Sequence, residues 1–157
     1  MSKHIEIVKL LIFQKATATL VIEQLELIAA NPNIYIEESD RMLDYSDDYL
    51  WLAMVDLLID NGYAFEIDWK ESYAEAKDCL VRLFEKSKVV VTLDEPDDFN
   101  WDADAEEFFP EINKILAEQG VYRLYNLDIN SDSYVTVLST IEKQEQLHSF
   151  DERIKLY

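Results

Sequence analysis

Glycine is scarce in this sequence, since Gly62 and Gly120 are the only two among 157 residues. Phosphate-binding loops need several glycines, because their backbone amides must approach the ligand closely. The sequence contains neither a G-x-G-x-x-G nor a G-K-[ST] element, and no serine lies in a G-x-S-x-G elbow. These absences exclude nucleotide binding of those kinds and a hydrolase nucleophile of that type.

Cysteine and histidine are also rare. Cys79 is the only cysteine, so the chain can form neither an internal disulfide nor a cysteine-based zinc site, and a reducing cytoplasm is the expected location. A chain of this length can bury a core without such cross-links, and no cofactor is expected. His4 and His148 lie near opposite ends of the sequence. We expect both to be exposed residues without a catalytic role.

Basic residues are few: 14 Lys and Arg stand against 33 Asp and Glu, which gives a net charge of -19. An acidic surface repels phosphate backbones and anionic membranes, so neither nucleic acid nor a membrane is expected as a direct partner. No run of about 18 apolar residues is present to span a bilayer. Because 49% of the residues are hydrophobic, the chain should fold and carry its acidity on the surface.

The negative charge is concentrated in the middle of the chain. Residues 1–30 are neutral and residues 112–157 carry -2, whereas residues 31–111 have 23 acidic against six basic residues and carry -17. Blocks of like charge usually indicate a solvated loop or an interaction surface. The first acidic cluster contains Glu37, Glu38, Asp40, Asp44, Asp47 and Asp48. The second has no basic residue in its 14 positions and contains Asp94, Glu95, Asp97, Asp98, Asp102, Asp104, Glu106 and Glu107.

The apolar spacing predicts helices and strands in a definite order. Helices are expected over 3–30, with a break near Thr17 and Thr19, and over 46–61, with Ser46 as a cap. Another helix should follow the Ser72–Glu75 capping box, and a further one, with Pro110 in its first turn, should reach Gln119. A short helix is expected over 142–148. Strands are expected over 63–69, 89–93, 122–127, 134–138 and 154–157. Gly62 and Gly120 are expected to end helices in the left-handed conformation.

This order, helices followed by a mainly C-terminal sheet, predicts the α+β class. We expect N-terminal helices packed on a mainly antiparallel sheet that the C-terminal half largely forms. No linker rich in Gly, Pro or Ser divides the chain, so a single domain over residues 1–157 is the simplest division.

The strongest metal-site candidate is the segment that contains Asp128, Asn130 and Asp132, because oxygen-bearing side chains at alternate positions open a calcium-binding EF-hand loop. That loop also needs Gly at its sixth position and Glu at its twelfth, where this chain has Ser133 and Ser139. A hairpin turn, in which Asp and Asn accept backbone amide hydrogens, is the preferred interpretation. We therefore predict no metal site and keep these three residues as weak candidates.

Aromatic side chains are interleaved with the carboxylates of the second acidic cluster: Phe99, Trp101, Phe108 and Phe109. Such a surface could dock a basic partner, with the rings as anchors and the carboxylates steering association. The rings could equally fold inward and hold the loop on the core. The sequence leaves both alternatives open.

Two segments carry a resemblance to known proteins. Gly62–Lys70 and Leu127–Tyr134 look like those of an uncharacterised family of small acidic bacterial proteins, over the region from Tyr49 to Leu138. That resemblance implies no activity and no catalytic residues. In size, acidity and α+β character the chain is also similar to bacterial immunity proteins, which neutralise toxin domains.

Our leading hypothesis is a non-enzymatic protein that binds a basic protein partner, for example an immunity protein that neutralises a cationic toxin. Its predicted binding residues are Asp94, Glu95, Asp97, Asp98, Phe99, Trp101, Asp102, Asp104, Glu106 and Glu107. No catalytic residue is predicted. The alternative is a carboxylate-rich hydrolase that depends on a divalent cation, and in a third interpretation the acidity serves only solubility or a salt-rich habitat.

Overall fold

The computed structural model describes residues 1–41 and 48–157. Asp44 and Asp47 of the first acidic cluster, and the predicted cap Ser46, lie outside the described residues. Four strands form one sheet in the order β1-β3-β2-β4, and each neighbouring pair is antiparallel. Their bounds are β1 (Ala64–Asp68), β2 (Tyr122–Leu127), β3 (Ser133–Thr140) and β4 (Ile154–Leu156).

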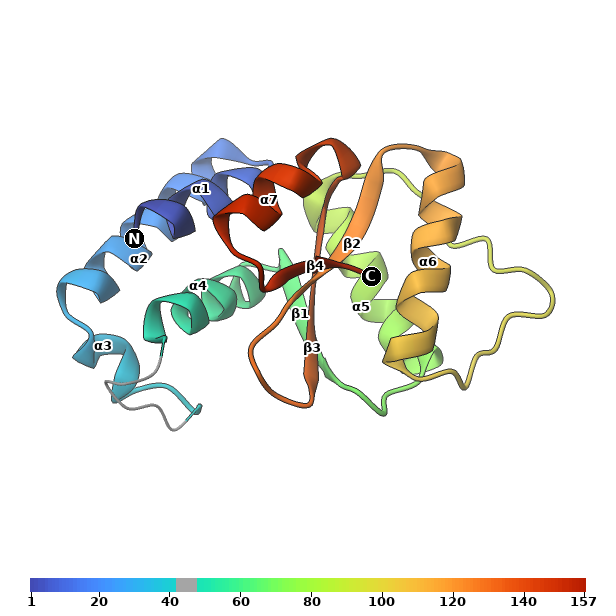
Figure 1. The fold of residues 1–157 in the computed structure, drawn as a ribbon, viewed down its shortest axis with the longest axis horizontal. Helices are drawn as coiled ribbons and strands as arrows, with labels where there is room; N and C mark the ends of the chain where they lie inside the picture. The colour runs from blue at the N-terminus through green and yellow to red at the C-terminus, as the bar shows by residue number, and fades with distance from the viewer. Residues whose placement is uncertain (42–47) are drawn as a thin grey trace.

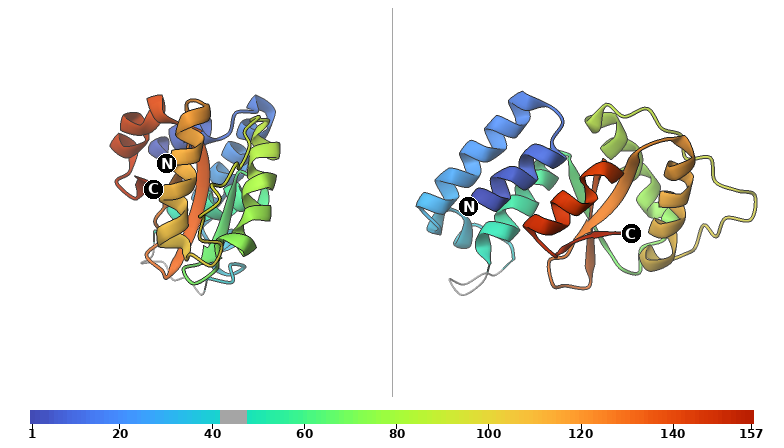
Figure 2. Two further views of the ribbon diagram at one scale, coloured as in Figure 1. Left: turned by 90° about the vertical axis from the view of Figure 1, so that its right-hand side faces the viewer. Right: turned by 45° about the horizontal axis from the view of Figure 1, so that its top comes forward.

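Helices cover both faces of this sheet (Figure 1). One layer contains α1 (Ser2–Leu11), α2 (Lys15–Ala30), α4 (Tyr49–Asp60) and α7 (Gln144–Phe150), with the short α3 (Asn33–Ile36) at its end and a 3₁₀ turn (Ile141–Lys143) before α7. The other layer contains α5 (Tyr73–Ser87) and α6 (Ala105–Gln119), which lie together in front of the sheet in the left view of Figure 2. The predicted α+β class, with a largely C-terminal antiparallel sheet, is confirmed.

Two hydrophobic cores result, one on each face of the sheet. Strands alternate their side chains between faces, and β2 places Leu124 in the core under α5 and α6 but Tyr125 in the core under α1, α2 and α4. In β3, Val137 and Leu138 are divided in the same way. The central strands therefore contribute to both cores.

The break between the first two helices lies at residues 12–14, not at the two threonines. Ile12 is extended and buried, and α2 then continues through Thr19. The hydroxyl of Thr19 donates to the carbonyl of Lys15 at 3.0 Å, which lets threonine lie within a helix. The helix predicted from Ser46 begins at Tyr49, and its cap Asp48 accepts a hydrogen bond from the amide of Trp51 at 3.4 Å.

The strand predicted over 89–93 is wrong. Lys88 ends α5 in the left-handed conformation, with φ of 56°, and the residues after it form no ladder. Gln119 takes the place of a partner strand, because its side-chain amide accepts from the amide of Thr92 at 2.8 Å and donates to the carbonyl of Thr92 at 2.7 Å. Val90 is 98% exposed, whereas Val89 is buried and Val91 and Leu93 pack against the core, so the segment runs along the surface with one side turned inward.

Two local predictions about the helix ends need correction. Helix α6 begins at Ala105, so Pro110 lies within it and not in its first turn. Gly62 has the expected left-handed φ of 76°, whereas Gly120 has φ of 152° and ψ of -148°, an extended conformation that glycine alone adopts readily.

His4 is buried, contrary to the sequence-based expectation, while His148 is exposed as expected. Only 3% of His4 is accessible, and neither ring nitrogen has a hydrogen-bond partner among residues 1–41 and 48–157. Burial, together with the positive N-terminus and Lys3, lowers the pKa of His4 to about 4. The imidazole is therefore neutral at physiological pH.

Candidate functional site

The second acidic cluster lies partly in the long loop between α5 and α6 and partly in the first turn of α6. This loop projects at one end of the molecule (Figure 1). Asp94, Asp97, Asp98, Asp102, Glu106 and Glu107 are exposed, and Asp104 is half-buried. These carboxylates therefore face solvent on the α5–α6 side of the sheet.

The aromatic residues of the cluster divide between the core and the surface. Phe108 and Phe109 are completely buried, so these two rings fold inward. Phe99 is half-buried and Trp101 is 44% exposed. The centroid of the Tyr73 ring lies 4.6 Å from that of Phe99 and 5.4 Å from that of Trp101. The loop thus rests on the start of α5 through an aromatic cluster.

Backbone hydrogen bonds hold the loop at the same place. The amide of Tyr73 donates to the carbonyl of Ala103 at 3.2 Å, and the amide of Ala74 donates to that of Trp101 at 3.4 Å. At the other end of the loop, Thr92 is bound by Gln119. The segment is therefore tied at both ends to the helical layer.

Glu95 differs from the other carboxylates because it is bound inside the protein. Its side chain is 10% exposed, forms an ion pair with Lys77 at 2.5 Å and accepts a hydrogen bond from the hydroxyl of Tyr73. Burial acts to raise the pKa of Glu95, but Lys77 and Tyr73 outweigh it and hold the pKa below its usual value. The Glu95 carboxylate is therefore already bound by Lys77 and Tyr73 within the protein.

Three carboxylates also stabilise the beginning of α6. Asp104 is its N-cap and accepts from the amide of Glu107 at 3.3 Å. Glu106 and Glu107 lie in the first turn, where negative charge interacts favourably with the helix dipole. These residues therefore have a structural role in addition to any role in binding.

We expect Asp104→Ala to lower the free energy of unfolding by about 1 kcal/mol, because it removes the side-chain acceptor of this cap. Urea denaturation measures the change. Asp102→Ala removes a neighbouring exposed acid and serves as the control. Equal stability of the two variants would contradict the capping role.

A groove lies between the loop and the first turns of α6, and we call it the acidic groove. Its volume is about 520 Å³. Half of its lining is apolar: Pro96, Phe99, Ala103, Phe108 and Pro110. The rest is polar and consists of Asn100 and four carboxylates: Asp98, Glu106, Glu107 and Glu111. Among the residues that the structure describes, no basic side chain lines it.

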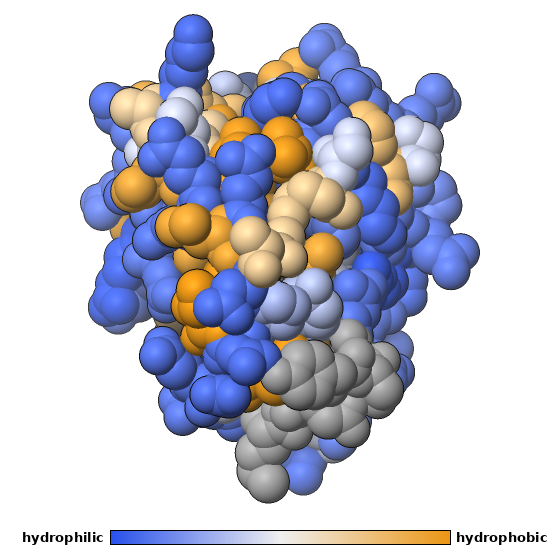
Figure 3. All heavy atoms as spheres, turned by 90° about the vertical axis from the view of Figure 1, so that its left-hand side faces the viewer, coloured by the Kyte–Doolittle hydropathy of each residue, from blue (hydrophilic) through white to orange (hydrophobic). Residues whose placement is uncertain are grey.

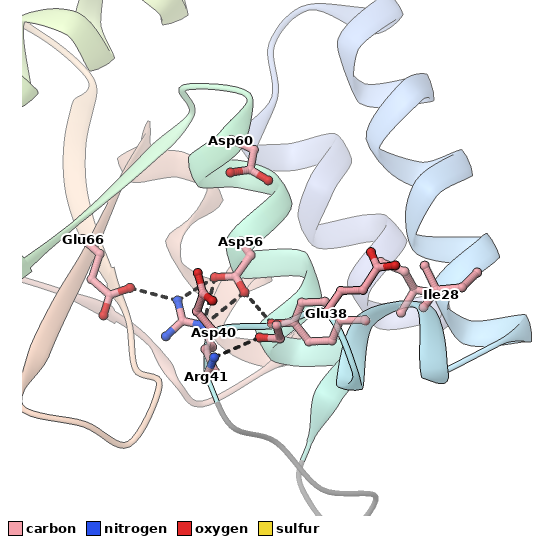
Figure 4. Close-up of a pocket in the computed structure, with 10 residues that line it drawn as sticks. Ile28, Glu38, Asp40, Arg41, Asp56, Asp60 and Glu66 are labelled. Atoms are coloured by element: carbon pink, nitrogen blue, oxygen red, sulfur yellow. Dashed lines mark hydrogen bonds and ion pairs between the residues drawn. The ribbon is translucent and has the colours of Figure 1, made fainter.

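Two residues of the first acidic cluster, Glu38 and Asp40, line a second pocket of about 600 Å³, shown in Figure 4. Here Arg41 lies between two carboxylates, at 2.6 Å from Asp56 of α4 and 2.8 Å from Glu66 of β1. Tyr35 also donates its hydroxyl to Asp56. Glu38, Asp40 and Asp60 complete the acidic lining. Arg41 therefore neutralises part of this pocket from within.

Sequence reasoning missed this arrangement. A signal was present, since Arg41 is the only basic residue between Lys15 and Lys70. Its partners Asp56 and Glu66 lie on different elements, so the tertiary fold alone brings them to Arg41.

Apolar side chains are exposed at the end of the molecule formed by α2 and α3. Leu20 is 50% exposed, Leu27 63% and Ile34 44%. Figure 3 shows apolar residues on this face, interspersed with hydrophilic ones. The acidic groove lies on the opposite side of the sheet, in the α5–α6 layer.

The weak metal candidates lie in the turn between β2 and β3. Asp128 binds Lys155 at 2.8 Å and accepts from the amide of Asn130 at 2.8 Å, and Lys155 together with that amide holds the pKa of Asp128 below its usual value. Asp132 is exposed and uses its backbone carbonyl to accept from the amide of Trp69. Within residues 1–41 and 48–157, no group of three or more His, Cys, Asp or Glu side chains could hold a metal ion.

The chain thus has the architecture of an acidic α+β protein with helices on both faces of an antiparallel sheet. It belongs to the family described as "Domain of unknown function (DUF6630)", whose sequence model matches residues 3–156. Comparisons with curated proteins and with solved structures found no match. In the described parts of the chain, no helix is long and apolar enough to cross a membrane.

Proposed function

We propose that this protein is a non-enzymatic interaction protein that binds a basic protein partner through the acidic groove. The observation that carries the proposal is the composition of that groove: four carboxylates around an apolar floor, with no basic side chain from the described part of the chain in the lining. An immunity protein that blocks a cationic toxin in the bacterial cytoplasm is the specific form that we propose.

Charge supports this function. Carboxylates that face solvent steer a cationic partner toward the surface and raise its association rate. In a complex with a nuclease, they would occupy the positions at which the enzyme binds phosphates. The apolar floor supplies the desolvated contacts that a complex needs at its centre. The groove combines both properties in one place.

Glu107→Gln is expected to weaken binding of a basic partner by about tenfold, because it removes one groove carboxylate. Glu118→Gln removes the same charge from the exposed end of the same helix and should leave the affinity unchanged. Basic proteins that the immobilised chain retains from its host at low salt are purified, and calorimetry measures their affinity for both variants. Raising the salt from about 50 to about 300 mM should weaken binding strongly. Salt-independent binding, or equal effects of the two variants, would contradict the proposal.

A further inference from the structure

We propose that the acidic groove receives an arginine side chain of the partner in preference to lysine. This inference rests on the proposed function and adds the chemistry of recognition to it. Arginine has a planar guanidinium that can stack on an aromatic ring and bind carboxylates with two parallel hydrogen bonds. Lysine has a compact ammonium that offers neither geometry.

The floor of the groove provides the aromatic ring. Phe99 lines the groove and is half-buried. Its ring is held in place by Tyr73, with a centroid distance of 4.6 Å, and by Trp101 at 6.0 Å. Cations already lie over rings nearby, since the ammonium of Lys77 is 4.8 Å from the centroid of Trp101. A partner's guanidinium over Phe99 would form a contact of the same kind.

The rim provides the carboxylates. Among the residues that the structure describes, no ion pair involves Asp98, Glu106 or Glu107, whereas Glu111 is paired with Lys114 at 2.5 Å. Asp98 approaches the groove from the loop, and the two glutamates come from α6. Three carboxylates on two walls therefore remain for a cation that enters between them.

The groove is also built before any partner arrives. The loop that forms one wall is tied at Thr92 to Gln119 and at Ala103 to Tyr73. A wall that is already ordered loses less conformational entropy when a ligand binds. Selectivity for a planar cation needs such a fixed geometry, because a flexible acidic loop would adapt to any positive charge.

The experiment compares two fluorescein-labelled peptides of equal length and charge, oligo-arginine and oligo-lysine, by fluorescence anisotropy. We expect the arginine peptide to bind the wild-type protein about tenfold more tightly than the lysine peptide, which corresponds to about 1.4 kcal/mol. Phe99→Leu keeps an apolar side chain but removes the ring, and it should reduce the arginine peptide to the affinity of the lysine peptide. Phe99→Tyr keeps the ring and should preserve the preference.

The outcomes separate this inference from the proposed function. Equal affinities of the two peptides for the wild-type protein would overturn the arginine preference, as would an unchanged preference in a folded Phe99→Leu variant. If Glu107→Gln nevertheless weakens both peptides and Glu118→Gln weakens neither, binding of a basic partner at the groove stands. If the two charge variants behave alike, the groove is not the binding site and both proposals fail.

Discussion

Asp151→Asn is expected to lower the free energy of unfolding by about 2–3 kcal/mol, because it removes the charge of a buried carboxylate at the centre of an ionic network. The Asp151 side chain is 4% exposed and pairs with Lys3 and with Arg153, each at 2.7 Å. A second bond from Arg153, at 2.8 Å, makes that pair bidentate. Arg153 also binds Asp48, the cap of α4, and stacks on Trp51 at 4.1 Å. One carboxylate thus connects α1, α4 and the end of α7.

Glu152→Gln is the matched control, since it removes the neighbouring exposed acid and should change stability by less than about 0.5 kcal/mol. Urea denaturation near neutral pH compares the two variants. The pKa of Asp151 is held far below its ordinary value by Arg153 and Lys3, so its contribution is complete near neutral pH and is lost only below about pH 4. Equal midpoints for both variants would show that the network contributes nothing.

The burial of His4 should make stability depend on pH in a different range. The pKa of His4 is about 4 in the folded protein, whereas a histidine exposed in the unfolded chain has the ordinary value of 6.5. The unfolded chain therefore binds the proton more readily. Stability is therefore complete above about pH 6.5 and falls as the pH decreases toward 4. The difference between the two pKa values corresponds to about 3 kcal/mol.

His4→Leu should remove this pH dependence, because no titrating group remains at the buried position. Urea denaturation between about pH 7 and about pH 4 measures the slope for each protein. His148→Gln removes the exposed histidine and should retain the wild-type slope. The assignment is wrong if His4→Leu keeps the slope of the wild-type protein over this range.

Local signals explain which elements the sequence predicts well. The capping box at Ser72 forms as expected, with Glu75 accepting from the Ser72 amide at 2.8 Å. Strand β1 alternates between buried Phe65 and Ile67 and exposed Glu66. The hairpin of β2 and β3 is also confirmed. Each of these features depends on residues close together in the chain.

The errors arise where a distant partner decides the conformation. Val89–Leu93 has the apolar character of a strand, but its polar partner is the side chain of Gln119. The burial of His4 follows from the packing of α1 against α7 and α4, which no local pattern records. In the first case the apolar character was recognised but the partner was not, and in the second the expected exposure of His4 was wrong because its neighbours come from other helices.

The same limit applies to the candidate site. The charge count identified Asp98, Glu106 and Glu107, and all three line the acidic groove. It could not separate them from Glu95, which Lys77 and Tyr73 bind internally. Nor did it include Glu111, which completes the groove one helical turn further along α6. The sequence shows which acids belong to a charge cluster, whereas packing decides which of their side chains line the groove.

The division of β2 and β3 between two hydrophobic cores has a consequence for how the protein unfolds. Leu124 and Tyr125 are adjacent in one strand but belong to different cores, so neither core can lose its packing while the strand stays intact for the other. We expect a single cooperative transition, with equal calorimetric and van't Hoff enthalpies. The helical layer that holds the acidic groove should melt together with the N-terminal helices.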